Sequence, residues 1–128
     1  MSAAPAIGFI GFGEAGSTIG NGLRSAGIGR LYAFDIKTHA PDFAPRILQR
    51  AAESQAALVE SSAELARGSD ILFSTVTSSA ALDAARQTAP FLEARHLYAD
   101  LNSVSPALKQ AIAKVMDAAG PPTSIGTR

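Results

Sequence analysis

The feature that most restricts the possible folds of this chain is a glycine-rich loop between an apolar run and a helical pattern. Residues 6–11 read Ala-Ile-Gly-Phe-Ile-Gly, without polar alternation, which is typical of a parallel strand buried on both faces. The loop, residues 11–16 (Gly-Phe-Gly-Glu-Ala-Gly), follows directly. Apolar residues then recur at helical spacing over residues 15–26, and residues 31–35 form a second apolar run. Strand, loop, helix and strand within about 30 residues predict one βαβ unit.

The same alternation continues along the chain. We predict further strands over residues 56–60, 71–76 and 97–101, and further helices over 45–53, from Ser61 or Ser62 to 68, over 79–88, and from the Ser105 cap and Pro106 to about 119. Strands that alternate with helices form a parallel sheet covered on both faces. The expected fold class is therefore α/β, a Rossmann-type doubly wound parallel sheet with the strand order 3-2-1-4-5. We assign residues 1–119 to this domain and the Pro- and Gly-rich residues 120–128 to a disordered tail.

Composition narrows the function classes. Basic and acidic residues number 11 each, and the resulting net charge of zero argues against a nucleic acid or a membrane surface as partner. The chain has no cysteine and its two histidines show no ligand spacing, so we expect no metal site. No apolar run reaches membrane-spanning length, and the first residues do not form a secretory signal. We expect a cytoplasmic location.

The glycine loop has the spacing G-x-G-x-x-G. In a dinucleotide-binding unit, Gly11 permits a tight turn, Gly13 lets the backbone approach a pyrophosphate, and Gly16 lets the helix pack closely on the strand. The first turn of the helix offers unpaired N–H groups and the positive end of its dipole. The alternative is a tight turn in a protein that binds no nucleotide. The predicted phosphate-binding residues are Gly11, Phe12, Gly13, Glu14, Ala15 and Gly16.

An acidic residue stands where a ribose would be recognised. Asp35 lies 19 positions after Gly16, at the end of the second predicted strand. Its carboxylate would accept hydrogen bonds from the adenosine ribose and would repel a 2′-phosphate, which favours NAD over NADP. Lys37 and His39 follow closely and could weaken that preference; the alternative for Asp35 is a solvated turn residue. We include Ile36 and Lys37 in the predicted cofactor site.

Two further loops follow the fourth and fifth predicted strands. Val76 and Thr77 are placed to touch the cofactor ribose, although a plain serine cap of the next helix explains this segment equally well. Asn102 and Ser103 offer donors and acceptors that suit a substrate carboxylate. Here the alternative is local capping of the last helix without substrate contact.

With these residues in hand, the chain resembles the N-terminal NAD-binding domain of the β-hydroxyacid dehydrogenase family, which includes 6-phosphogluconate dehydrogenase, 3-hydroxyisobutyrate dehydrogenase and glyoxylate-type reductases. Residues 7–16, 70–77 and 100–106 carry the resemblance. The last segment is similar to the family's substrate motif, Asp-x-Ser-Thr-x-x-Pro, with Asn102 in place of its serine and Ser103 in place of its threonine. This pair is similar to the 6-phosphogluconate dehydrogenase branch, and it implies that both residues bind substrate.

The resemblance also implies that the catalytic lysine of the family is not among these residues. Family members are longer, and their second, helical domain supplies the catalytic lysine and most of the dimer interface. None of Lys37, Lys109 and Lys114 lies in a glycine-rich motif of that kind, so we assign no catalytic residue. We expect a truncated oxidoreductase with negligible turnover by itself, acting in its parent on a small hydroxy acid or the matching carbonyl compound, with possible self-association into a homo-oligomer. A non-catalytic NAD-binding sensor or assembly module, or an imine reductase-type N-terminal domain, remains the alternative.

Overall fold

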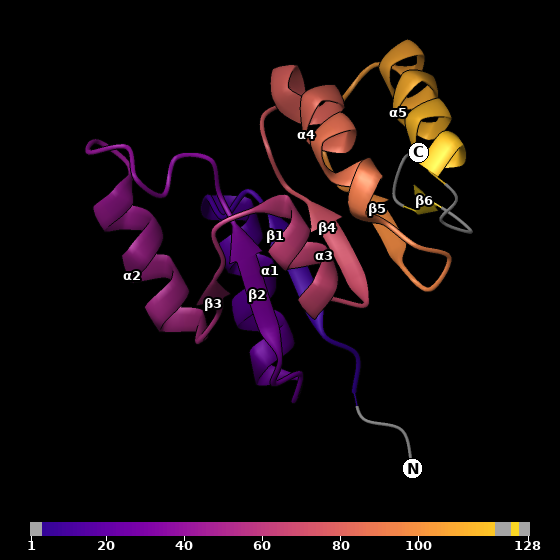
Figure 1. Ribbon diagram of the computed structural model, residues 1–128. Helices are drawn as coiled ribbons and strands as arrows, with labels where there is room; N and C mark the ends of the chain where they lie inside the picture. The colour runs from indigo at the N-terminus through magenta and orange to yellow at the C-terminus, as the bar shows by residue number, and fades with distance from the viewer. Residues whose placement is uncertain (1–3, 120–123, 126–128) are drawn as a thin grey trace.

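The computed structural model describes residues 4–119 and 124–125. At the centre of its sheet lies β1 (Ile7–Ile10), whose four residues are all buried, as the unbroken apolar run predicts. β1 pairs in parallel with β2 (Leu31–Phe34) and with β4 (Ile71–Ser74). β3 (Ala57–Leu58) extends the sheet beyond β2, and β5 (Leu97–Asp100) extends it beyond β4. The strand order 3-2-1-4-5 is thus confirmed (Figure 1).

Helices cover both faces of this sheet, because alternate residues of each strand point to opposite sides. Ile7 and Phe9 of β1 belong to a core cluster that α1 and α2 help to bury, whereas Ile10 belongs to a second cluster built with α3, α4 and α5. Two 3₁₀ turns, η1 and η2, flank α4. The helices and turns are α1 (Glu14–Ser25), α2 (Ala44–Ser54), α3 (Ser62–Gly68), η1 (Ser78–Ala80), α4 (Ala81–Thr88), η2 (Ala89–Phe91) and α5 (Pro106–Ala119).

Two helix starts follow the capping chemistry of the sequence. The Ser61 hydroxyl accepts a hydrogen bond from the Glu64 N–H at 3.1 Å, so Ser61 rather than Ser62 caps α3. At the start of α5, the Ser105 hydroxyl accepts from the Leu108 N–H at 3.2 Å, and Pro106 is the first helical residue. Both helices therefore begin where the sequence predicts.

The C-terminal end of the chain differs from the expectation. Ser124–Ile125 forms a sixth strand, β6, which pairs in parallel with β5 at the edge of the sheet. The prediction of a disordered tail is therefore wrong for these two residues, whose pairing with β5 no local signal reveals. The remainder of that predicted tail, residues 120–123 and 126–128, lies outside the described residues. In the part of the chain that the structure covers, no helix has the length and apolar character needed to cross a membrane.

Candidate functional site

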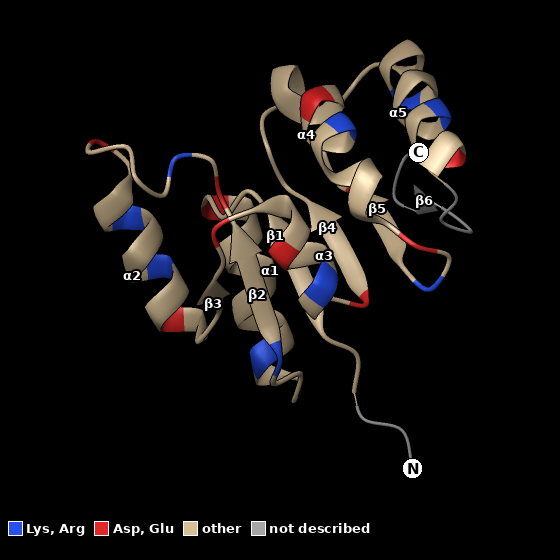
Figure 2. Cartoon of the chain, in the orientation of Figure 1, with Lys and Arg blue, Asp and Glu red and all other residues tan. Residues whose placement is uncertain are grey.

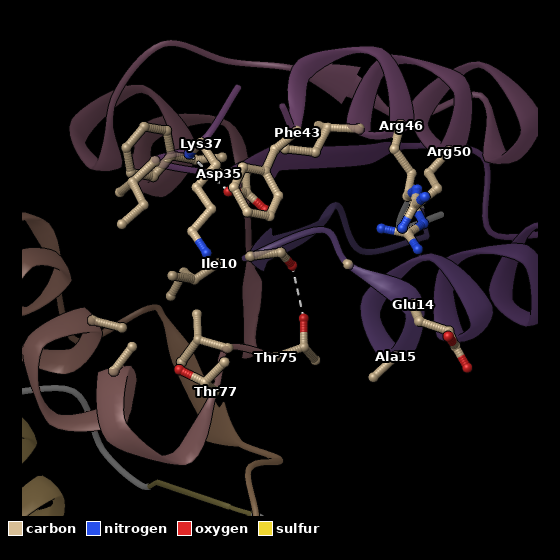
Figure 3. Close-up of a pocket in the computed structure, with 18 of the residues that line it drawn as sticks. Ile10, Glu14, Ala15, Asp35, Lys37, Phe43, Arg46, Arg50, Thr75 and Thr77 are labelled. Carbon is tan, nitrogen blue, oxygen red and sulfur yellow. Dashed lines mark hydrogen bonds between the residues drawn. The ribbon is translucent and has the colours of Figure 1, made fainter. Parts of the chain in front are cut away.

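An open cavity of about 580 Å³ lies where β1, β2 and β4 end (Figure 3). Its volume falls in the range of small-molecule sites. The winding of the sheet reverses between β1 and β4, and in open parallel sheets ligands bind at such a point. Nine of the eleven predicted cofactor residues line the cavity, namely Gly11, Gly13, Glu14, Ala15, Asp35, Ile36, Lys37, Val76 and Thr77.

Two glycines of the loop occupy positions where a side chain cannot fit. Gly11 has a φ of +84°, and a Cβ there would lie 2.7 Å from the Thr75 carbonyl oxygen. A Cβ at Gly16 would lie 2.6 Å from the Thr75 Oγ1 and 2.9 Å from the Gly11 carbonyl oxygen. The Thr75 hydroxyl donates to that same carbonyl oxygen at 2.7 Å, so the residue directly after β4 holds the loop at its tightest point. Gly16 is buried behind the loop and does not line the cavity.

Gly13 lies in the opposite environment. A Cβ built on it would have no atom within 4 Å, so the space in front of this residue is open. Gly13 is also the N-cap of α1, and it provides no side-chain cap. Among the hydrogen bonds of the described residues, none is donated by the N–H groups of Glu14 or Ala15. The first turn of α1 therefore presents unpaired donors and a positive dipole end to the cavity, which suits an anion.

The Asp35 carboxylate fastens the end of β2 to the glycine loop. Its Oδ2 accepts from the Phe12 N–H at 2.8 Å, and its Oδ1 accepts from the Lys37 N–H at 2.9 Å. Each oxygen keeps a second lone pair with which it can accept a ligand hydroxyl. The ring of Phe12 is fully buried and packs on Phe9, with the ring centroids 5.4 Å apart. Phe12 thus meets the site through its backbone alone and does not line the cavity.

The residues after Asp35 form the outer wall of the cavity. The side chain of Ile36 is exposed, and the ammonium group of Lys37 lies 4.3 Å from the centroid of the Phe43 ring (Figure 3). Phe43 lines the cavity from the turn before α2, and sequence reasoning did not single it out. The available signal in the sequence was an aromatic residue in the Pro-containing segment that follows the second predicted strand.

The loops after β4 and β5 are joined by one amide side chain. The Asn102 Oδ1 accepts from the Val76 N–H at 2.8 Å, and the Asn102 Nδ2 donates to the Ser74 hydroxyl at 3.0 Å. Asn102 is buried and does not line the cavity, and neither does the exposed Ser103. The structure therefore brings Asn102 next to Val76, one of the predicted cofactor residues, but it places neither Asn102 nor Ser103 in the cavity. Ser78 and Ser79 both lie within η1, and neither η1 nor α4 has a side-chain capping hydrogen bond, so the alternative of a serine cap does not hold.

Two arginines that the sequence analysis did not single out line the same cavity. Arg46 and Arg50 both belong to α2 and lie one helical turn apart. Their spacing of four residues places them on one helix face, and this was the available signal. Asp83 and Gln87 of α4 complete the opposite wall.

A buried polar cluster lies beyond the cavity, around the end of β5. The Tyr98 hydroxyl and the Asp100 Oδ2 are buried, and neither has a hydrogen-bond partner among the described residues. Burial raises the pKa of the Tyr98 hydroxyl well above its ordinary value, and the Asp100 carboxylate adds to the rise. Ser74 opposes the rise in this pKa, although its hydroxyl does not reach hydrogen-bond geometry with Tyr98. Tyr98 therefore stays protonated at physiological pH.

Several solved structures share the fold of this chain. A conserved hypothetical protein from Sinorhizobium meliloti 1021 is 33% identical, with a TM-score of 0.83 over 91% of this chain and 39% of that protein. A conserved protein of unknown function, described as structurally similar to 3-hydroxyacid dehydrogenases, is 27% identical, with a TM-score of 0.72 over 88% of this chain and 40% of its own. More distantly, 3-hydroxyisobutyrate dehydrogenase from Mycobacterium tuberculosis (18% identical, TM-score 0.78, covering 96% of this chain and 39% of its own) shares the fold.

Sequence comparison agrees. An uncharacterised 28.5 kDa protein from Methanothermus fervidus is 30% identical over 111 residues, which are 87% of this chain and 41% of that protein. The chain thus spans about 40% of the length of these relatives. A sequence model described as the NAD-binding domain of 6-phosphogluconate dehydrogenase matches residues 6–123. The chain therefore belongs to the family of 6-phosphogluconate dehydrogenase-type NAD(P)-binding domains.

Proposed function

We propose that the chain binds NAD(H) in the cavity at the ends of β1, β2 and β4. The observation that carries this proposal is the open space in front of Gly13, at the uncapped N-terminus of α1. A pyrophosphate there would accept hydrogen bonds from the first-turn N–H groups while Gly11 and Gly16 keep the loop close to β4. The cavity continues to Asp35 and Phe43, which leaves room for the adenosine half of the cofactor.

We propose NAD rather than NADP because of Asp35. The carboxylate is held in place by two backbone N–H groups, so it cannot easily turn away from a ligand. Its remaining lone pairs suit ribose hydroxyls, and its charge would repel a 2′-phosphate. Lys37 lies over Phe43, where its charge opposes this effect only in part.

We also propose an activity for a longer protein that contains this domain. Such a protein would oxidise a small hydroxy acid, or reduce the matching carbonyl compound, with the nicotinamide as hydride carrier. We propose that Ser103 faces the substrate and that Asn102 supports that loop through its bond to Val76. No residue described here is assigned as general acid or base. The cytoplasmic location stays a prediction of the sequence.

Replacement of Gly13 tests the proposed binding mode. A Gly13→Val side chain would fill the open space in front of the α1 N-terminus, so calorimetric titration should show NADH binding lost or weakened by more than about tenfold. Gly22→Val is the matched control, since Gly22 lies in the same helix with no atom within 4 Å of a Cβ and does not line the cavity. Unchanged NADH affinity in Gly13→Val, with the fold intact by circular dichroism, would refute the proposal.

A further inference from the structure

We propose that Arg46 and Arg50 form an arginine clamp on α2 that binds the pyrophosphate of the dinucleotide beside the first turn of α1. This inference rests on the proposed function and adds to it a pair of residues that recognises the phosphates. Both residues lie on α2, where they are the two blue stretches in Figure 2, and both line the cavity.

The packing of α1 and α2 brings the pair to the phosphate end of the cavity. Arg24, near the end of α1, donates from its Nε to the Ser54 carbonyl oxygen at 3.2 Å and from its Nη2 to that of Gln55 at 2.8 Å. These bonds tie the C-terminal ends of the two helices together. Since both helices follow strands of one parallel sheet, they run in the same direction. Arg46 and Arg50 of α2 line the same cavity as Glu14 and Ala15 at the start of α1.

The arginine side chains extend toward the beginning of α1. Figure 3 shows Arg46 and Arg50 reaching from α2 to the side of the cavity where Glu14 and Ala15 lie, and Lys37 on the other side, next to Phe43. The guanidinium groups are therefore placed toward the first turn of α1, which holds the proposed pyrophosphate, rather than toward the part of the cavity where Lys37 would meet a 2′-phosphate.

The charges around the pair point to an anionic ligand. Two cations four residues apart on one helix repel each other, which destabilises the helix slightly unless an anion lies between them. The carboxylates that line the cavity are Glu14, Asp35, Asp42 and Asp83, and none of them forms a salt bridge with either arginine in the part of the chain that the structure describes. The Glu14 carboxylate points away from the guanidinium groups in Figure 3.

Arginine is suited to this task. Its planar guanidinium group matches the oxygens of a phosphate with two parallel hydrogen bonds, and the resulting charge-assisted bonds are stronger than neutral ones. Together with the N–H groups of Glu14 and Ala15, the clamp would surround the pyrophosphate with positive groups from two helices. Arg46 is exposed and Arg50 half-buried, so both can adjust to a ligand.

Three probes separate the clamp from other effects: ADP-ribose, which has the pyrophosphate, adenosine, which has none, and adenosine 2′-phosphate, which has a phosphate elsewhere. Arg46→Gln and Arg50→Gln should each weaken ADP-ribose binding about 10- to 100-fold and leave adenosine binding unchanged, since each removes charged hydrogen bonds to the phosphates. Arg67→Gln is the control, because it removes the same charge from an exposed site on α3 away from the cavity.

Inorganic pyrophosphate provides an independent arm. Added to the ¹⁵N-labelled chain, it should shift the Gly13 and Ala15 amide signals and the Arg46 and Arg50 Nε–H signals, and the double Gln variant should lose the amide shifts. The clamp is overturned if ADP-ribose binds both single variants as well as the wild type, if adenosine weakens equally, or if only adenosine 2′-phosphate weakens. If Gly13→Val loses ADP-ribose binding while Arg46→Gln and Arg50→Gln keep it, the proposed function stands and the clamp does not. If pyrophosphate binding depends on the two arginines but the chain does not bind NADH, the clamp stands and the proposed function does not.

Discussion

Gly11 and Gly27 illustrate two reasons why a position requires glycine: a positive φ and a lack of space for a Cβ. Both have a positive φ, of +84° and +98°, but only Gly11 is also crowded, with its Cβ position 2.7 Å from the backbone oxygen of Thr75. At Gly27 a Cβ would meet nothing within 4 Å. Gly27→Ala should therefore lower the free energy of unfolding by only about 1–2 kcal/mol, the usual cost of the left-handed conformation.

Gly11→Ala should cost more, because the steric conflict with Thr75 adds to the same conformational cost. We expect a total loss of roughly 3 kcal/mol or more, at the upper end of what backbone strain causes. Urea denaturation of both variants measures the difference. Equal losses would show that β4 moves away from the loop at little cost.

Asp35 sets the expected cofactor preference. Asp35→Ser removes the charge that opposes a 2′-phosphate, so the ratio of the dissociation constants for NADPH and NADH should fall by about tenfold or more, corresponding to about 1.4 kcal/mol. Asp117→Ser, an equal change of charge on the exposed side of α5, should leave the ratio as it is. Fluorescence titration with both cofactors gives the two constants. If the ratio does not change, the carboxylate does not lie at the ribose.

At this scale the sequence predicts the backbone roles better than the side-chain directions. The three glycines and Asp35 follow from spacing, because the loop geometry imposes a residue type at each position. The burial of Phe12 does not, since the direction of its ring depends on the turn made at Gly11. The bonds of Asn102 depend on β4 and β5 meeting side by side, which the local sequence does not contain.

At the scale of elements, local and non-local signals differ in the same way. Helix starts are predictable because caps are local, as Ser61 and Ser105 show. Strand ends are less predictable: β4 ends at Ser74 although the predicted strand continues to Val76, whose N–H bonds to the Asn102 side chain and not to a neighbouring strand. The segment predicted as a helix over residues 79–88 likewise begins with the turn η1, since it lacks a capping side chain.

At the scale of the whole molecule, topology alone predicts where the site lies. Alternating strands and helices imply the strand order, and the order implies a cavity at the switch point. The clamp of Arg46 and Arg50 was not predicted, because it requires knowledge of how α2 packs against α1. The sequence thus locates the cavity, and the packing of the helices decides which charges surround it.

The stability of the whole molecule at alkaline pH should depend on Tyr98. Its pKa is raised in the folded state, mainly by burial, whereas in the unfolded chain it returns to about 10. Above that pH the unfolded chain releases the proton and the folded chain keeps it, so the unfolded state binds fewer protons and the free energy of unfolding falls as pH rises. Below pH 10 both states hold the proton, and the contribution of Tyr98 is constant.

Tyr98→Phe removes this one titration while it keeps the buried ring. Between about pH 10 and 12, the decline of the unfolding free energy should become shallower by up to about 1.4 kcal/mol per pH unit relative to the wild type. At pH 7 the loss should be small, because the hydroxyl has no hydrogen-bond partner among the described residues. Tyr32→Phe is the matched control at the partly buried second tyrosine. Urea denaturation over this pH range measures the slopes, and a slope in Tyr98→Phe equal to that of the wild type would show that the buried hydroxyl ionises within the folded protein.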